Sequence, residues 1–206
     1  MTKAVLINHN FTPTWLLESD LDYVIYDRSD SKDYLKDFDQ SKIIYQENIG
    51  QVDYPKLSYL IDNYDSLPDV FLWGKTNLFK YITEEEYEKV ANNKEFTPLL
   101  TMGHKTYSDE KGVVCEYKNG IYWERNPLLY FSNWKHCIDF PAFAEMFNLP
   151  NPAYIPFAPG GNYILTKKVV HKHPKELYAK MRDVLPYTRD PLEAHFCERA
   201  YYLLWA

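Results

Sequence analysis

Cysteine is scarce in this sequence. The chain of 206 residues contains only Cys115, Cys137 and Cys197, and no CxxC pair. Three thiols cannot all pair with one another, so the sequence shows no complete disulfide framework. A chain of this length can bury enough apolar surface to fold without such crosslinks. The few cysteines therefore favour a reducing, intracellular compartment.

Glycine is also scarce, and neither of the common glycine-rich phosphate loops is present. The chain contains seven Gly, and neither GxGxxG nor GxxxxGK[ST] occurs. Those loops allow backbone N–H groups to approach the phosphates of dinucleotides and nucleoside triphosphates. The sequence therefore does not support an ordinary dinucleotide-binding domain or a P-loop NTPase.

Long apolar runs are absent as well. Residues 4–7 form an apolar segment that is far too short for the core of a signal peptide. The uncharged stretch 146–166 is interrupted by four prolines and two glycines, which are typical of a loop. We therefore expect no membrane-spanning segment and a cytoplasmic protein.

Positive charge is in deficit too. The chain has 23 Lys and Arg against 29 Asp and Glu, a formal net charge of −6. Because nucleic-acid backbones bind to clustered positive charge, we expect no nucleic-acid partner. Residues 167–199 nevertheless carry eight Lys or Arg against five acids. This local excess indicates either an ordinary solvated face or a surface that helps to neutralise a diphosphate.

Aromatic residues, in contrast, are abundant, with 19 Tyr, 11 Phe and 5 Trp. Tyr and Trp join a flat apolar face to a hydrogen-bonding edge, which suits core packing and also the binding of sugars and bases. Tyr122, Trp123, Tyr130 and Trp134 lie close together in the sequence. They indicate either part of the core or a platform on which an acceptor sugar stacks.

Strand and helix signals alternate in the first half of the chain. Short apolar runs followed by polar residues predict buried strands at 4–7, 23–26, 42–45 and 70–73. A helix is expected to begin near Asp53, with Pro55 in its first turn. Buried strands separated by helices imply an α/β fold with a mostly parallel sheet and helices on both faces.

The second half predicts a hairpin, two further strands and two helices. The Asn119-Gly120 pair is a strong turn signal between apolar runs. The expected elements are a hairpin of 113–117 with 121–124, strands at 128–131 and 162–166, and helices at 174–185 and 190–205. No linker or repeat interrupts the pattern, so we expect a single α/β domain over 1–206, as a whole protein or as one module of a longer chain.

Polar residues follow each of the first four predicted strands. In an open parallel sheet, ligands bind beyond the carboxyl ends of the strands, where the strand order reverses. Those ends read Asn8-His9-Asn10, Asp27-Arg28, Asn48-Ile49-Gly50 and Gly74-Lys75-Thr76-Asn77. They indicate a nucleotide or sugar site, or simply the polarity of strand ends exposed to solvent.

Several segments, in order, resemble a family of sugar-transferase-like domains. These segments are AVLINHN with TWL, YVIYDRS, ENIGQVDYPKLSYLIDNYDSLPDVFLWG, FAPGGNYILTKKVVHKHPKELY and CERAYYLLW. The resemblance covers nearly the whole chain and extends to the N-terminal domain of a large algal virus's glycosyltransferase. That family resembles the GT-A class, in which an α/β sheet binds a nucleotide sugar. The resemblance thus implies a GT-A-like glycosyltransferase domain, located in the host-cell cytoplasm if the protein is viral.

The resemblance also implies which positions contact the substrates. The implied nucleotide contacts are Asn8, His9 and Asn10 for the nucleoside, Asp27 with Arg28 for the uracil edge, and Asn48, Gly50, Lys56, Lys75, Thr76 and Asn77 for the rest of the nucleotide. The implied contacts of the donor sugar and the acceptor are Gly160, Gly161 and Asn162, with Trp134.

The expected metal motif is missing at its usual place. Many GT-A enzymes bind Mn²⁺ through an Asp-x-Asp that ends the fourth strand, since hard carboxylates bridge the ion to the diphosphate. Here residues 73–77 read Trp-Gly-Lys-Thr-Asn, and the triplets Asp20-Leu21-Asp22 and Asp37-Phe38-Asp39 precede strands instead. We expect Mn²⁺ or another divalent cation with unknown ligands, bound mostly by the diphosphate and water, unless Lys75 replaces part of its charge.

The last predicted helix offers candidate catalytic residues. His195, Glu198, Arg199 and Tyr202 follow an i, i+3, i+4, i+7 spacing, so they share one face. That face is either an ordinary solvated surface or a catalytic one. In the catalytic interpretation Glu198 deprotonates the acceptor hydroxyl, and His195 or Arg199 contacts the diphosphate or a metal.

The leading hypothesis is a hexosyl- or deoxyhexosyltransferase that moves a sugar from a UDP-sugar to a glycan or glycoprotein acceptor, assisted by Mn²⁺. The alternative is a catalytically silent domain that binds nucleotide sugars or glycans, which the missing Asp-x-Asp favours. A glycoside hydrolase needs two convergent carboxylates, and no spacing in the sequence singles out such a pair.

Overall fold

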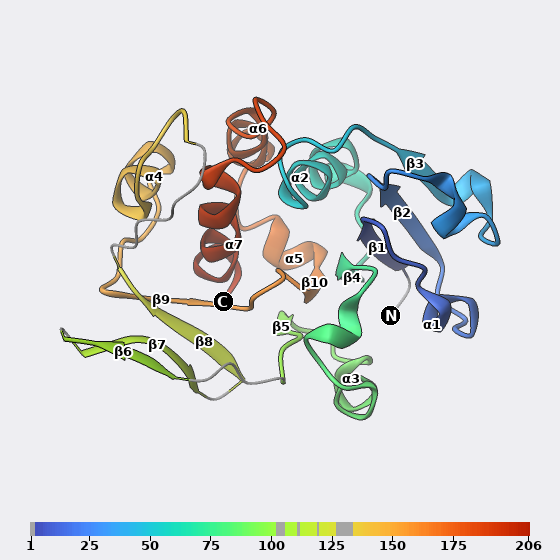
Figure 1. The fold of residues 1–206 in the computed structure, drawn as a ribbon, viewed down its shortest axis with the longest axis horizontal. Coiled ribbons are helices and arrows are strands. Elements are labelled where there is room, and N and C mark those ends of the chain that lie inside the picture. The colour runs from blue at the N-terminus through green and yellow to red at the C-terminus, as the bar shows by residue number, and fades with distance from the viewer. Residues whose placement is uncertain (1–2, 102–105, 111, 119, 127–133) are drawn as a thin grey trace.

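A six-stranded mixed sheet forms the centre of the computed structural model, which describes residues 3–101, 106–110, 112–118, 120–126 and 134–206 (Figure 1). The sheet has the order β3-β2-β1-β4-β10-β5. Its strands are β1 (Lys3–Asn8), β2 (Tyr23–Asp27), β3 (Ile43–Tyr45), β4 (Val70–Lys75), β5 (Thr97–Pro98) and β10 (Tyr163–Thr166). The first four strands are parallel, and β10 runs antiparallel to β4 and β5. The predicted α/β fold with a mostly parallel sheet is confirmed.

Strand β1 is the most buried part of this sheet. Ala4, Val5 and Leu6 have no exposed surface, and successive residues enter opposite core clusters, Val5 on one face and Leu6 on the other. β2 pairs with one side of β1 and β4 with the other. The strand order therefore reverses at β1, which makes the gap beyond β1 and β4 the switch point of the sheet.

The strand predicted at 42–45 differs from the other three. It forms as β3, but β3 lies at the edge of the sheet, and Ile44 and Tyr45 are exposed. Their apolar character suggested burial on both faces, whereas an edge strand of three residues has only one neighbour to pack against. The expectation that this strand is buried was wrong for these two residues.

Helices cover both faces of the sheet (Figure 1). The α-helices are α1 (Thr14–Leu17), α2 (Asp53–Asp62), α3 (Glu84–Val90), α4 (Phe140–Phe147), α5 (Lys167–Val170), α6 (Lys175–Asp183) and α7 (Leu192–Trp205). Short 3₁₀ turns lie at Lys32–Leu35, Gln40–Lys42, Tyr64–Ser66 and Leu78–Lys80. Buried residues of α2, α4, α6 and α7 form one core cluster, and those of α1 and the 3₁₀ turns join the other. No helix in the described part of the chain is long and apolar enough to cross a membrane.

A second sheet of four antiparallel strands contains the predicted hairpin. Its strands are β6 (Tyr107–Asp109), β7 (Gly112–Lys118), β8 (Ile121–Arg125) and β9 (Tyr154–Phe157), in that order. β7 and β8 pair from Lys118 and Ile121 onward, which confirms the hairpin, although Asn119 and the strand predicted at 128–131 lie outside the described residues. β9 packs against α7 and continues towards β10, so it joins the second sheet to the first.

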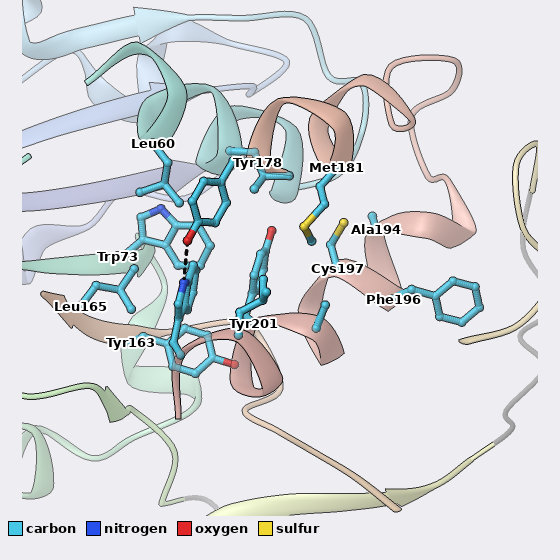
Figure 2. Close-up of a cluster of buried hydrophobic side chains, with 14 of the residues drawn as sticks. Leu60, Trp73, Tyr163, Leu165, Tyr178, Met181, Ala194, Phe196, Cys197 and Tyr201 are labelled. Atoms are coloured by element: carbon cyan, nitrogen blue, oxygen red, sulfur yellow. Dashed lines mark hydrogen bonds between the residues drawn. The ribbon is translucent and has the colours of Figure 1, made fainter. Parts of the chain in front are cut away.

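Many of the aromatic residues lie in the core between the main sheet and α7. Figure 2 shows Trp73, Tyr163, Tyr178 and Tyr201 gathered there from β4, β10, α6 and α7. Trp205 stacks on Tyr201 with ring centroids 5.1 Å apart, and its Nε1 donates to the Tyr178 hydroxyl at 3.1 Å. Since each of these rings is at most 1% exposed, packing accounts for a substantial part of the Tyr and Trp excess.

Candidate functional site

The carboxyl ends of β1, β2 and β4 are tied together by the side chain of Asn8. Asn8 Nδ2 donates to Asp27 Oδ1 at 3.0 Å, and Asn8 Oδ1 accepts from Thr76 Oγ1 at 2.5 Å. The Thr76 amide also donates to the Ile7 carbonyl at 3.0 Å. Asn8, Asp27 and Thr76 are at most 2% exposed. The structure thus brings together candidate residues from three separate segments of the sequence.

Asp27 is bound within this framework. Its Oδ1 accepts from the Ser29 hydroxyl at 2.6 Å and from the Ser29 amide at 3.2 Å, in addition to Asn8. The neighbouring loop is held in the same way, since Asn10 Nδ2 donates to Asp30 Oδ2 at 2.8 Å. These bonds connect the loops that follow β1 and β2, so Asp27 orders the strand ends whether or not a ligand is bound.

A pocket of about 180 Å³ lies at the switch point of the sheet, where the ends of β1 and β4 meet the start of α2. It is lined by Ile7, His9, Arg28, Gln51, Val52, Lys75, Thr76 and Asn77. Five of these residues were predicted as nucleotide contacts: His9, Arg28, Lys75, Thr76 and Asn77. Gln51 was not predicted, although it directly follows the predicted Gly50. A larger hollow of about 660 Å³ lies elsewhere, around α6 and the ends of α4 and α7, and includes none of the predicted site residues.

Arg28 brings buried hydrogen-bond donors to the pocket. Its side chain lines the pocket while only 4% of the residue is exposed. Within the described part of the chain, its Nε and Nη1 have no hydrogen-bond acceptor. Burial lowers the pKa of Arg28 to about 10, against the opposing charge of Asp53, so the side chain is still a cation at neutral pH. Buried donors without acceptors cost free energy, which an anionic ligand in the pocket would recover.

The start of α2 forms the second wall of the pocket. Gly50 and Gln51 both have positive φ, at 64° and 54°. Their amides donate to the carbonyls of Thr188 at 2.8 Å and Arg189 at 3.1 Å, which fixes the chain just before the helix. A side chain at position 50 would place its Cβ 2.6 Å from the Cβ of Tyr54. Because Gln51 and Val52 line the pocket, the start of α2 adjoins it, and a helix start carries a partial positive charge.

Asn48, also predicted as a nucleotide contact, lies outside the pocket lining. It is half-buried and its Oδ1 has no hydrogen-bond partner among the described residues, but it does not line the pocket. Its position before Gly50 places it in the segment that leads into α2.

Lys56, in the first turns of α2, is fully buried. Its Nζ donates to the Gly161 carbonyl at 2.5 Å and lies 4.5 Å from the centre of the Trp73 ring. Burial lowers the pKa of Lys56, against the opposing charge of Asp53. Burial likewise raises the pKa of Asp53, whose Oδ1 accepts from the Tyr201 hydroxyl at 2.8 Å. Lys56 thus supports the turn that contains Gly161 and does not line the pocket itself.

The turn of Gly160 and Gly161 adjoins the same region. Both glycines have positive φ, at 86° and 62°, and the Gly160 amide donates to Glu198 Oε1 at 2.6 Å. The next residue, Asn162, is fully buried, and its Oδ1 accepts from the Lys75 amide at 2.8 Å. Of the predicted donor-sugar residues, Asn162 is therefore linked to the pocket through Lys75, and Gly160 and Gly161 directly precede it.

Replacing Gly160 by Ala tests how closely this turn is packed. The new Cβ would lie 2.7 Å from the ring of Tyr81 and 2.9 Å from Asn162 Nδ2. We expect a loss of about 1–3 kcal/mol of unfolding free energy in urea, from backbone strain and this clash. Gly120→Ala is the control, because its φ is also positive at 76° but its Cβ would meet nothing within 4 Å. Equal losses in the two variants would contradict the close packing.

Glu198 has both carboxylate oxygens engaged. Besides the Gly160 amide on Oε1, Oε2 accepts from Arg199 Nη1 at 2.9 Å. Arg199 Nε in turn donates to Glu124 Oε2 at 2.7 Å. Glu198 and Arg199 bond to each other, as helical spacing suggested. The further partner of Arg199, Glu124, comes from β8, 75 residues earlier, and no sequence signal pointed to it.

His195 and Trp134, a predicted catalytic and a predicted sugar-binding residue, lie outside the pocket lining. His195 Nε2 lies 3.8 Å from Asp190 Oδ1, and burial together with the charge of Arg199 lowers its pKa. Trp134 is 55% exposed and precedes Lys135, whose amide donates to Glu193 Oε1 at 3.1 Å. Neither residue lines the pocket. Of the other proposed platform rings, Tyr122 packs edge-on against Phe157 at 5.4 Å, and Tyr130 lies outside the described residues.

The pocket lining offers no carboxylate to a divalent cation, so the expected Mn²⁺ stays a prediction with unknown ligands. No group of three His, Cys, Asp or Glu side chains suited to a metal occurs in the described part of the chain, and the pocket lining contains no Asp or Glu. The two Asp-x-Asp triplets have other partners: Asp22 pairs with Lys42 at 2.9 Å, and Asp39 accepts from the Ser41 amide at 3.0 Å. The pocket is lined instead by the cations Arg28 and Lys75.

Comparisons with known proteins identify a family but no characterised relative. A family model described as "Protein of unknown function (DUF3431)" matches residues 7–206. No curated protein and no solved structure matches the chain. The matched range includes every residue that lines the pocket.

Proposed function

The chain belongs to the DUF3431 family, and we propose that it is a glycosyltransferase that takes a sugar from a UDP-sugar. One observation carries this proposal: a buried guanidinium with unpartnered donors, that of Arg28, lines the pocket at the switch point of the sheet. Nucleotides commonly bind at that point in open α/β sheets. The resemblance of the ordered segments to GT-A domains narrows the expected nucleotide to a UDP-sugar.

The proposed donor extends across the ends of three strands. Its diphosphate lies beside Arg28 and Lys75, its uridine lies towards the loop of Asn8–Asn10, and its sugar lies towards Gly160. Support for this direction comes from the Lys75 amide, which bonds to Asn162 immediately after the Gly160–Gly161 turn. The pocket of about 180 Å³ has room for the phosphates, and the sugar extends beyond it.

The proposed transfer breaks the bond between the anomeric carbon and the phosphate oxygen. The electron pair of that bond stays on the departing UDP, and the acceptor hydroxyl oxygen forms the new bond while its proton goes to a base. The protein contributes by positioning donor and acceptor and by stabilising the charge on UDP with cations. Glu198 is the proposed base if transfer inverts the anomeric centre, and the leaving phosphate can take the proton if transfer retains it.

A catalytically silent domain that binds nucleotide sugars is the second candidate. The observation that favours it is the double engagement of Glu198, whose oxygens bond to the Gly160 amide and to Arg199. A base must present a free lone pair to the acceptor hydroxyl, and these two bonds leave the Glu198 carboxylate only part of its accepting capacity. A binding domain requires no free lone pair at this position.

Calorimetric titration with UDP, followed by assays of UDP-sugar hydrolysis and transfer, tests the proposal. We expect UDP to bind more tightly than ADP or GDP, and UDP to be released from at least one UDP-sugar. Absence of UDP binding, with and without Mn²⁺, would reject the nucleotide-sugar proposal altogether. Binding without release of UDP from any UDP-sugar would favour the silent domain.

Asp27→Ala tests the nucleoside end of the proposed site. The variant removes the acceptor of Asn8 and Ser29 and leaves buried donors unpaired. We expect a loss of about 1–3 kcal/mol of unfolding free energy and UDP binding weakened roughly tenfold, which is about 1.4 kcal/mol. Asp65→Ala, in an exposed position, serves as the control. Unchanged UDP affinity in Asp27→Ala would reject its role at the nucleoside.

A further inference from the structure

The pocket at the switch point presents positive charge from several sides. Arg28 and Lys75 line it directly, and His9, which also lines it, has its Nε2 3.3 Å from Nη2 of Arg189. Gln51 and Val52 bring the start of α2 to the same pocket, and a helix start carries roughly half a positive elementary charge. None of the lining residues is Asp or Glu; the opposing charge that acts on Arg28 comes from Asp53, outside the lining.

The carboxylates that surround the pocket are already bonded to other groups. Asp27 accepts from Asn8 and Ser29, and Asp53 accepts from the buried hydroxyl of Tyr201. Glu198 accepts from the Gly160 amide and Arg199, and Asp190 accepts from the side-chain amide of the lining residue Gln51. A divalent cation that takes a protein carboxylate as ligand would have to draw it from one of these bonds, and a cation bound by the diphosphate and water alone would lie beside the cations Arg28 and Lys75. Neighbouring like charges repel strongly in a buried site.

We infer that Arg28, Lys75 and the N-terminus of α2 bind the diphosphate of the donor directly, with no divalent cation between the phosphates and the protein. This inference rests on the proposed function, because it names how the proposed UDP-sugar is held. It replaces the Mn²⁺ that the GT-A resemblance led us to expect.

The chemistry of the guanidinium suits this role. Arg presents its N–H groups as a planar fork that matches two phosphate oxygens, and it stays charged when buried. Arg28 is held at its backbone, since its amide donates to the Asn8 carbonyl at 3.1 Å and its carbonyl lies 3.1 Å from His9 Nδ1. The donors are therefore in place before the ligand arrives. A preorganised cation stabilises the charge on a leaving diphosphate without further rearrangement.

Calorimetric titration in EDTA separates this inference from the function on which it rests. The titrants are UDP and inorganic pyrophosphate, each with EDTA and with Mn²⁺. We expect UDP to bind in EDTA with an affinity within about threefold of that in Mn²⁺, a difference below 1 kcal/mol. Binding of UDP only with Mn²⁺ would overturn the inference and leave the proposed function standing. Absence of UDP binding in both conditions would overturn the proposed function itself.

Arg28→Gln tests which group holds the phosphates. In EDTA we expect the variant to bind both UDP and pyrophosphate roughly 10- to 100-fold more weakly, because charge-assisted hydrogen bonds are lost. Arg182→Gln is the matched control, since among the described contacts the side chain of Arg182 bonds only to Asp183, at the protein surface. Equal affinities in Arg28→Gln and Arg182→Gln would overturn the inference.

The thermal stability of the unliganded variant distinguishes a ligand-binding role from a structural one. Because Nε and Nη1 of Arg28 have no acceptor in the described part of the chain, Arg28→Gln removes a buried charge and few bonds. We expect its melting temperature without ligand to equal or exceed that of the wild-type protein. A marked fall in melting temperature would show that Arg28 serves the fold, and would overturn the inference.

Discussion

Trp205→Ala is expected to lower the free energy of unfolding by about 3–5 kcal/mol. Trp205 is 1% exposed and stacks on Tyr201 at 5.1 Å with an interplanar angle of 3°. It also meets the edge of Trp73 at 5.1 Å. Removing the indole leaves a cavity that these rings cannot fill without leaving their own contacts, so the cost exceeds that of the lost apolar surface alone.

The loss of the indole N–H adds to this cost. Trp205 Nε1 donates to the Tyr178 hydroxyl, which itself donates to the Val170 carbonyl at 2.8 Å. Equilibrium unfolding in urea provides the measurement, and Trp134→Ala the control, because Trp134 is 55% exposed and its removal should cost less than about 0.5 kcal/mol. Similar losses in both variants would show that the cluster around Trp205 does not stabilise the fold as its packing indicates.

Local sequence patterns predicted the framework of the fold well. Most predicted elements lie where expected: the strands at 4–7, 23–26 and 70–73 and the helices α2, α6 and α7. Continuous apolar runs indicate strands buried on both faces, and a 3.6-residue apolar period indicates helices, so both can be recognised in the sequence. The edge strand β3 was predicted as buried because its composition resembles that of the central strands. Composition alone does not show whether a strand has one neighbour or two.

The location of the pocket could also be predicted, but its chemistry could not. Parallel strands bring their carboxyl ends to one edge, so Asn8, Asp27 and Thr76 had to lie near one another. Their roles depend on side-chain directions: Asp27 accepts from Asn8 and Ser29, whereas Arg28 lines the pocket with no acceptor for its Nε and Nη1 in the described part of the chain. Adjacent polar residues in a sequence do not reveal which of them remains unpartnered.

Contacts across long sequence separations were beyond prediction. Lys56 was expected at the nucleotide. It donates instead to Gly161, 105 residues later, because α2 and the turn before β10 lie in contact. The same holds for Arg199 and Glu124, 75 residues apart. No local pattern encodes such pairs, and an acidic residue on β8 resembles any solvated one in the sequence.

Glu198→Gln is expected to reduce the turnover number of the proposed transferase by about 10²- to 10⁴-fold, if Glu198 is the base. Gln keeps an oxygen that can accept from the Gly160 amide, so the turn before β10 is retained. UDP affinity is expected to stay within about twofold, because Glu198 does not line the pocket. The measurement is steady-state transfer from the UDP-sugar that the wild-type protein turns over, together with UDP titration of both proteins.

The two roles open to Glu198 give opposite patterns in this experiment. A base acts on the acceptor proton, so its loss lowers the turnover number and leaves UDP binding nearly unchanged, whereas the weaker bond to Arg199 lowers the melting temperature in either role. A purely positioning carboxylate acts through Arg199 and Gly160, so its loss lowers the melting temperature and weakens donor binding together. Glu193→Gln is the matched control, since this carboxylate of the same helix accepts from the His136 amide at 2.7 Å, and its loss should reduce stability without a specific loss of turnover. A turnover number unchanged in Glu198→Gln would exclude Glu198 as the base and leave proton removal to the leaving phosphate, as in retaining transfer.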